Sequence, residues 1–224
     1  AASDVYKRQV VLRGPILTRS GYGEQTRFAY RALKSQSDKF DIFVVPTGWG
    51  KTGWIVEDTP EREELDKNII STSEHIKHCN TLGVTPFDIS IQVTIPQEWE
   101  KLAAVNIGFT AGTETTHISL PWVNKSNEVD RIIAVSEHTK SGFTNTVYTG
   151  KNQIGQDVQV QCTTPVDVVN FPAKINMEPT PVELDLDTKF NFLSVVQWGP
   201  RKNLENTILG VIDEFRTEED VGLV

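Results

Sequence analysis

The sequence lacks long apolar runs and is poor in cysteine. No stretch approaches the ~20 consecutive apolar residues that a membrane-spanning helix needs, and the first residues contain no apolar core of a signal peptide. Cys79 and Cys162 lie far apart and match no metal-binding or redox spacing. These absences predict a soluble, cytoplasmic protein in a reducing compartment.

Basic residues are also scarce relative to acidic ones. The 224 residues carry 22 Lys and Arg against 30 Asp and Glu, a formal net charge of -8. This balance repels a phosphate backbone, so general binding to nucleic acid or to an anionic membrane is disfavoured outside a local basic patch. Hydrophobic residues make up 38% of the chain, which is enough to bury a core in one large or two smaller domains.

Apolar, β-branched runs alternate with helical patterns along the chain. A Thr59-Pro60 pair marks the start of one helix, and Ser136 is placed to cap another. This alternation predicts an α/β fold with a doubly wound, mainly parallel sheet that binds ligands at the carboxyl ends of its strands. The expected strands of the first domain cover residues 9–13, 41–46, 88–96, 105–112, 131–135 and 158–163.

A glycine-containing turn follows the first expected strand. Gly21, Tyr22 and Gly23 precede a helix predicted from the spacing of apolar residues over 28–33. Thr26 stands where a dinucleotide-binding fingerprint requires its third glycine, so that fingerprint is not supported. The turn is interpreted either as an ordinary glycine turn or as a loop whose backbone approaches a ligand closely.

The second expected strand is followed by a loop rich in glycine and tryptophan. Gly50, Lys51 and Thr52 suggest a P-loop, but Val45 occupies the position of its first glycine, which excludes an ATPase interpretation. Trp49 and Trp54 are compatible with one wall of a binding site or with an aromatic cluster that packs the loop.

Two further groups of residues contain side chains that could bind a ligand. The first, His75, His78 and Cys79, matches no zinc spacing, so no metal site is predicted there. The second is expected on a loop at the carboxyl end of a strand, where open α/β sheets bind ligands, and consists of Glu114, His117 and Trp122.

The stretch NFLSVVQWGPRKNLENTILGVIDEF, residues 191–215, combines a strand signal with a helix signal. Its apolar run, 192–196, predicts a buried parallel strand, and the apolar spacing over 204–215 predicts an amphipathic helix. Arg201 and Lys202 are expected at the helix N-terminus, where free backbone N–H groups favour an anion. Two cations at such a turn also fit a solvated loop, because helix starts generally favour acids.

This stretch resembles the start of the second domain of group 1 (family 4) glycosyltransferases of the GT-B fold. Two further segments, GPILTRSGYGEQTRFAYRAL and VNIGFTAGTETTHISLPWVNKSNEVDRIIAVSEHTKSGF, resemble elements of the first domain of the same family. The resemblance implies that Lys202 binds the donor phosphate, with Arg201 in place of an arginine that the family carries nearer Gln197.

The resemblance also implies roles for residues of the first domain. The glycine loop would face donor phosphate and acceptor, and Ser136 and His138 would start a helix beside the ligand. A cap role for Ser136 remains an equal alternative. Relatives place a histidine at a strand end near the donor sugar; Glu114 or His117 could take that place, or the contact could be absent.

The expected organisation has four parts. Residues 1–9 contain DVYKRQ, which resembles a translated transposon end from sequencing libraries and is excluded from the fold as an adapter-derived scar. Residues 10–171 form the acceptor domain, 172–189 a linker and 190–224 the start of a truncated donor domain. The chain is therefore interpreted as a fragment.

The resemblance implies a retaining, metal-independent glycosyltransferase without a cofactor. It would use a nucleotide-diphosphate sugar and a glycan, lipid or small-molecule acceptor, with Arg201 and Lys202 stabilising charge on the leaving diphosphate. The family's acidic donor-binding pair would lie beyond Val224, so little or no activity is expected from these residues alone. The alternatives are a non-enzymatic, two-lobed α/β small-molecule-binding module and a structural domain used for assembly.

Overall fold

The computed structural model describes residues 6–151, 154–173, 178, 181–196 and 198–224. Contacts divide the chain into two compact units, Ala1–Ala173 and Lys174–Val224. Each unit is described by itself.

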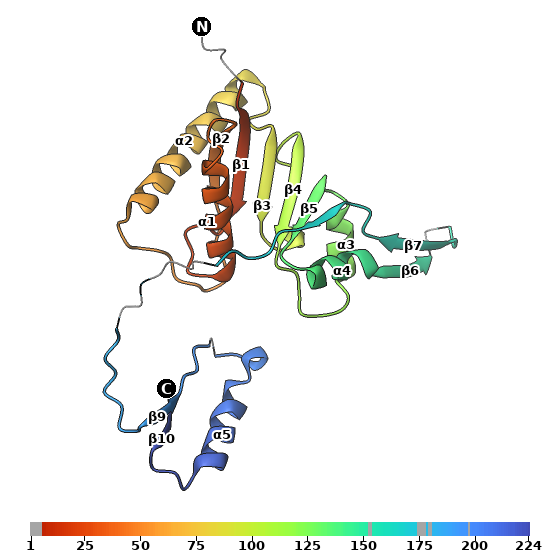
Figure 1. The fold of residues 1–224 in the computed structure, drawn as a ribbon. Coiled ribbons are helices and arrows are strands. Elements are labelled where there is room, and N and C mark those ends of the chain that lie inside the picture. The colour runs from red at the N-terminus through yellow and green to blue at the C-terminus, as the bar shows by residue number, and fades with distance from the viewer. Residues whose placement is uncertain (1–5, 152–153, 174–177, 179–180, 197) are drawn as a thin grey trace. The chain divides into compact units, whose positions relative to one another are not determined.

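The first unit is built on a six-stranded sheet with the order β2-β1-β3-β4-β5-β8, in which every neighbouring pair is parallel (Figure 1). Strand β1 is central to the topology because the chain extends the sheet to one side of it and then to the other. The predicted doubly wound α/β fold is therefore confirmed. The strands are β1 (Arg8–Gly14), β2 (Phe40–Pro46), β3 (Ile89–Val93), β4 (Val105–Thr110), β5 (Arg131–Ala134) and β8 (Val166–Val168).

Local sequence signals explain where the helices of this unit begin. Ser20, Thr59 and Ser136 each accept a hydrogen bond from a backbone N–H in the first turn of the helix that follows, as N-cap side chains do. Pro60 occupies the first turn after Thr59, and Gly83 ends the same helix in the left-handed conformation. The helices are α1 (Gly21–Lys34), α2 (Pro60–Leu82), α3 (Leu120–Ser126) and α4 (Glu137–Asn145), with a 3-10 turn η1 (Pro96–Glu98).

Helix α2 covers the free edge of the sheet. Thr72 Oγ1 accepts a hydrogen bond of 2.8 Å from the backbone N–H of Val44 in edge strand β2. Helix α2 is also tied to α1, since Arg31 forms an ion pair with Glu61 at 2.6 Å. Covering an edge strand in this way removes unpaired backbone groups that could pair with another chain.

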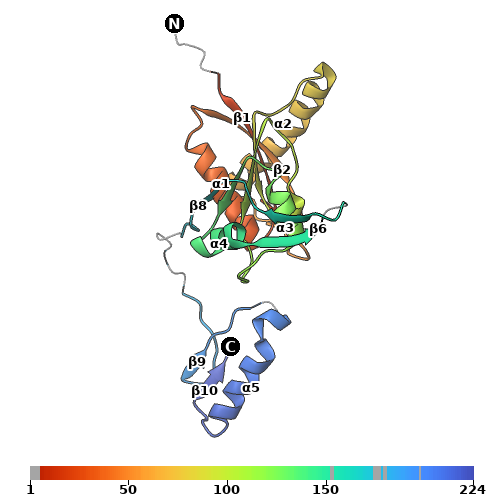
Figure 2. The ribbon, with the colours of Figure 1, turned by 90° about the vertical axis from the view of Figure 1, so that its right-hand side faces the viewer.

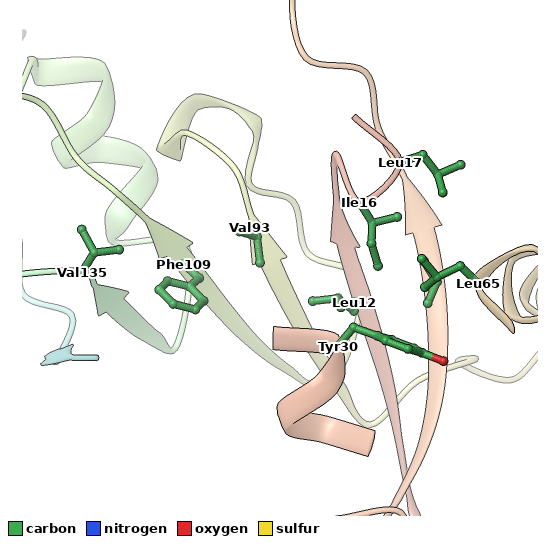
Figure 3. Close-up of a cluster of buried hydrophobic side chains, with 9 residues drawn as sticks. Leu12, Ile16, Leu17, Tyr30, Leu65, Val93, Phe109 and Val135 are labelled. Carbon is green, nitrogen blue, oxygen red and sulfur yellow. The ribbon is translucent and has the colours of Figure 1, made fainter. Parts of the chain in front are cut away.

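Two clusters of buried side chains hold the helices on the sheet. The first joins α1 and α2 to the strands through residues such as Leu12, Tyr30 and Leu65 (Figure 3). The second joins α3 and α4 to the far end of the sheet and includes Trp99 and Phe143. Because these side chains are almost entirely removed from water, they supply most of the hydrophobic stabilisation of the unit.

The predicted strand over 158–163 is not part of the parallel sheet. Strand β7 (Asp157–Gln161) pairs antiparallel with β6 (Val147–Lys151) in a separate hairpin, and β8 takes the last place in the sheet. The strict alternation of valine with polar residues in β7 is typical of a half-exposed strand rather than of a buried parallel one. Val147 of β6 is exposed.

The start of the chain also differs from the expectation. Arg8 and Gln9 belong to β1 and pair with Phe40 and Asp41, although residues 1–9 were excluded from the fold. Tyr6 Oη lies 2.9 Å from Asp88 Oδ2, the carboxylate that also accepts from the backbone N–H of Gln9. Residues 1–5 lie outside the described part of the chain.

The second unit consists of two short parallel strands and one helix. Strand β9 (Phe190–Phe192) pairs with β10 (Val221–Leu223), and α5 (Leu204–Phe215) lies beside them, preceded by the 3-10 turn η2 (Pro200–Lys202), as Figure 2 shows. The predicted helix over 204–215 is confirmed.

The buried strand predicted over 192–196 is wrong in both length and burial. Strand β9 ends at Phe192, and the side chains of Leu193 and Val195 are 73% and 84% exposed. A single helix covers only one side of this two-stranded sheet. The apolar side chains on the other side therefore have nothing to pack against among the described residues.

Among the described residues, no helix is long and apolar enough to cross a membrane.

Candidate functional site

The point at which the strand order reverses is a candidate ligand-binding edge of the sheet. In open α/β sheets ligands bind outside the carboxyl ends of the strands, at the point where the order reverses. Here β1 lies between β2 and β3, so that point is the edge where β1 and β3 end. The segment after β1, the start of α1 and the loop after β4 all belong to this edge.

The two glycines after β1 have different roles. Both belong to the first turn of α1 rather than to a loop, which corrects the expected glycine loop. A Cβ at Gly23 would lie 2.3 Å from the carbonyl oxygen of Thr18, so this glycine lets α1 pack on the preceding segment. A Cβ at Gly21 would meet nothing within 4 Å, and only Gly21 leaves open space for a ligand.

Tyr22 ties the start of α1 to the end of β4. Its hydroxyl lies 2.9 Å from Thr110 Oγ1 and accepts a hydrogen bond of 3.1 Å from the backbone N–H of Ala111. Burial raises the pKa of Tyr22 above its ordinary value of 10.0, while its hydrogen bonds to Thr110 and Ala111 oppose that rise. Tyr22 is therefore a neutral, fixed side chain at physiological pH.

The same line of hydrogen bonds continues to α4. Thr139 Oγ1 donates to the carbonyl oxygen of Ala111 at 2.8 Å and lies 3.1 Å from Ser136 Oγ. Gly112 makes this approach possible, because its φ is +75° and a Cβ there would lie 2.5 Å from Thr139 Cγ2. The line thus joins the predicted site residues Tyr22 and Ser136 across the end of β4, through the backbone of Ala111 and the side chain of Thr139.

The first turn of α4 has the predicted cap. Ser136 Oγ accepts a hydrogen bond of 3.1 Å from the backbone N–H of Thr139, which confirms its cap role. His138 lies in the same turn with an exposed side chain. The amino ends of α1 and α4 are both joined to the end of β4, and their backbone N–H groups favour a negatively charged group nearby.

The loop after β4 carries the other predicted residues. Glu114 and His117 are exposed, and His117 Nδ1 lies 3.0 Å from Thr116 Oγ1. No described hydrogen bond or ion pair joins His117 to the Tyr22–Ser136 line. Trp122 does not lie on this loop: it is buried in α3, which begins after Ser119 with a proline in its first turn, so the expected loop placement is wrong.

An apolar pocket adjoins the line of hydrogen bonds. Its volume is about 130 Å³. The ring of Trp49 stacks on Tyr22 with 4.2 Å between centroids, and Trp49 forms one wall of this pocket. Trp54 is not among the lining residues, and it instead pairs through its backbone with Thr18. The lining residues are Gly21, Tyr22, Gln25, Trp49, Ala111 and Phe171.

Arg201 and Lys202 belong to the second unit and form a separate candidate site. They lie in the 3-10 turn η2, one residue before α5, rather than in the first turn of the helix as expected. Both are exposed, and Asn203 follows them in the left-handed conformation with φ of 52°. Gln197, the residue compared with the family's arginine, lies outside the described residues.

His75 of α2 has structural partners. His75 Nε2 lies 2.8 Å from the carbonyl oxygen of Pro86, and its ring stacks on Phe43 with 4.3 Å between centroids. The described residues contain no group of three or more His, Cys, Asp or Glu side chains that could hold a metal ion.

Comparisons with known proteins give little further information. No family model matches the sequence, and no curated protein matches it. A solved structure of UGT89C1 from Arabidopsis thaliana, complexed with UDP-L-rhamnose, is similar with a TM-score of 0.39 and 13% identity, over 98% of this chain and 69% of that chain. At this TM-score the likeness carries no weight, so a functional assignment depends on the residues described above.

Proposed function

We propose that this chain is part of a glycosyltransferase that moves a sugar from a nucleotide-diphosphate sugar to an acceptor. The observation that carries the proposal is the carboxyl edge of the first sheet, where the Tyr22–Ser136 line joins two helix amino ends beside an aromatic pocket. An edge of this kind offers backbone donors for a negatively charged group and an apolar wall for an acceptor.

In this proposal the two units have different tasks. The first unit binds the acceptor at the edge that contains Gly21, Tyr22 and Ser136. The second binds the diphosphate through Arg201 and Lys202, whose positive charges stabilise the charge that develops as the glycosidic bond breaks. Retention of configuration and independence of metals are further parts of the proposal and depend on the family resemblance alone.

The donor role is tested by binding rather than by turnover. UDP and GDP are titrated into the chain by calorimetry, alongside the Lys202→Ala variant. Loss of a charge-assisted hydrogen bond costs about 1.5–3 kcal/mol, so affinity should fall at least tenfold. Lys189→Ala, which removes another exposed lysine of the second unit, is the matched control and should bind as the parent does. Equal affinity of the Lys202→Ala variant and the parent would overturn the proposed role of Lys202.

A non-enzymatic binding module is the second candidate. It is favoured by the chemistry of the Tyr22–Ser136 line, in which the titratable group, Tyr22, has a raised pKa and cannot act as a base near neutral pH. A binder of this kind would take small molecules at the aromatic pocket and show no affinity for UDP or GDP in the same titration.

A further inference from the structure

Tyr22 presents a fixed aromatic ring at the carboxyl edge of the first sheet. Its backbone belongs to the first turn of α1. Its hydroxyl, at the other end of the side chain, lies 2.9 Å from Thr110 Oγ1 and accepts a hydrogen bond of 3.1 Å from the backbone N–H of Ala111. A ring that is held at both ends is a preformed surface on which another flat ring can stack.

Trp49, which stacks on this ring, is held much less firmly. The two rings lie 4.2 Å apart between centroids, with an interplanar angle of 29°. The hydrogen bonds described for Trp49 involve its backbone carbonyl oxygen, which accepts from the N–H and the Oγ1 of Thr52, and none of them reaches the indole N–H. Packing alone therefore holds the Trp49 ring in place among the described residues.

The loop that carries Trp49 can change its conformation at low cost. Backbone hydrogen bonds of 3.0 Å at Thr47 and 2.8 Å at Gly53 tie its ends to β1 and to the segment after β1. Between these ties, a Cβ at Gly48 or Gly50 would meet nothing within 4 Å. A surface segment with few buried contacts opens more easily than the elements that it connects.

The space beside the stacked rings suits a flat, mainly apolar group. The aromatic pocket has a volume of about 130 Å³, and Phe171 supplies a third aromatic side chain to its lining. An apolar cavity of about 150 Å³ in another protein binds benzene, and departure of the Trp49 ring would enlarge this space further. A sugar ring would lose hydration at several hydroxyls in such a lining, whereas an aromatic ring would not.

We propose that Tyr22 is a platform on which a flat aromatic ring of a ligand stacks, and that Trp49 covers this platform as a gate until the ligand displaces it. This inference deepens the proposed function, because the ring would belong to the acceptor; that link to sugar transfer rests on the proposed function. Binding of the ring itself requires neither a nucleotide sugar nor turnover, so the two claims can fail separately.

The platform is tested with indole, which has the same ring system as the side chain that it would replace. A gate that is open about 10% of the time or less lowers apparent affinity tenfold or more, so Trp49→Ala should bind indole at least tenfold more tightly than the parent. Saturation-transfer NMR measures affinity, and intermolecular NOEs to the Tyr22 ring locate the probe. The matched control is Trp54→Ala, which removes a 50% exposed tryptophan of the same loop and should bind as the parent does.

The gate is tested with two alanine substitutions in the loop. Gly50 has a φ of +52°, whereas Gly48 is not among the glycines with positive φ. The left-handed conformation is unfavourable for alanine, so Gly50→Ala should depopulate the closed loop and bind indole about fivefold more tightly than the parent. Gly48→Ala adds the same methyl group to open space and should bind as the parent does. Thermal unfolding of both variants should stay close to that of the parent, because both glycines are exposed.

Two results would each overturn the inference. One is equal indole affinity in Trp49→Ala and the parent, and the other is equal indole affinity in Gly50→Ala and Gly48→Ala. Titration of UDP into the same proteins separates this inference from the proposed function. UDP binding without indole binding to Trp49→Ala would contradict the platform alone, and indole binding without UDP binding would contradict the transferase alone.

Discussion

The two units of this chain are built from the same kinds of element, yet they bury very different amounts of apolar surface. In the first unit, Leu12 and Val11 of strand β1 are fully buried between flanking strands and helices. In the second, Leu193 and Val195 follow the short strand β9 and are largely exposed. Whether an apolar run forms a strand, and whether it is buried, therefore depends on how many neighbouring elements cover it. The predictions below test this difference.

The largest effect is expected when a leucine of the first unit is replaced by alanine, and the same replacement in the second unit serves as the comparison. Leu12→Ala removes a side chain with 0% exposure and should lower the free energy of unfolding of the first unit by about 2–5 kcal/mol. Leu193→Ala removes an exposed side chain and should change stability by less than about 0.5 kcal/mol. Urea unfolding followed by far-UV circular dichroism measures both, and similar losses in the two variants would contradict the comparison.

A pair of glycine substitutions should have effects of opposite sign. Gly23→Ala places a Cβ 2.3 Å from the backbone oxygen of Thr18, so the first unit should lose about 1–3 kcal/mol. Gly210→Ala lies within α5, meets nothing within 4 Å and should stabilise that helix by up to about 1 kcal/mol. Thermal melts measure the first change, and amide hydrogen exchange of α5 measures the second. A neutral Gly23→Ala would show that α1 does not depend on this close contact.

The hydrogen bonds of the two units span different lengths of chain. Tyr22 bonds to Thr110, 88 residues away, whereas Thr188 and Asn191 bond to each other three residues apart. Tyr22→Phe should cost about 1–2 kcal/mol at pH 7, since each net hydrogen bond contributes about 1 kcal/mol. Thr188→Val should cost less than about 0.5 kcal/mol.

The Tyr22→Phe variant also has an expected pH dependence. Burial raises the folded-state pKa of Tyr22 above 10.0, so its contribution is fully present below that pH and is lost as the pH rises through the folded-state pKa. Above pH 10 the parent should therefore lose stability more steeply than the variant. Urea unfolding between pH 8 and pH 11 (about three units, around the ordinary tyrosine pKa) measures this. Parallel curves would contradict the burial of the phenol group.

The smallest effect is expected at ion pairs. The hydrogen bond from Lys34 lowers the pKa of Glu64 below 4.5, so the stability from this carboxylate is present above its ordinary pKa and is lost as the pH falls through the folded-state pKa. Both side chains are partly exposed, so Glu64→Gln should cost below about 1 kcal/mol at pH 7 and flatten the acid limb below pH ~4.5. Asp220→Asn, which breaks a more exposed pair with Lys189, should cost less, and a larger loss there would contradict the comparison.

Much of the first sheet could be predicted because its signals are local. Strands β1, β2, β3, β4 and β5 follow from short β-branched runs, and the start of α2 follows from Thr59 and Pro60. The cap role of Ser136 is a signal of the same kind. Strand β8 was missed because its three residues, Val166–Val168, are too few to establish a pattern.

The candidate site was predicted less completely. The sequence indicates Tyr22 and Ser136, but their link through Ala111 and Thr139 depends on contacts between residues far apart in sequence. Gln25 carries no sequence signal, because a polar residue within a helix is usually exposed. Trp122 lies in α3 rather than on the expected loop because the helix starts after Ser119, with Pro121 in its first turn.

The sequence by itself determined the order of strands β1 to β5, the caps of α2 and α4, and the carboxyl edge at which polar and glycine residues gather. These features depend on side-chain periodicity and on hydrogen bonds within one turn of the chain. Only the tertiary structure decided that Gly23 serves packing while Gly21 faces open space, and that Gln25 Oε1 is buried without a hydrogen bond among the described residues. Burial and pairing depend on which distant segments cover a residue, and no local pattern encodes that.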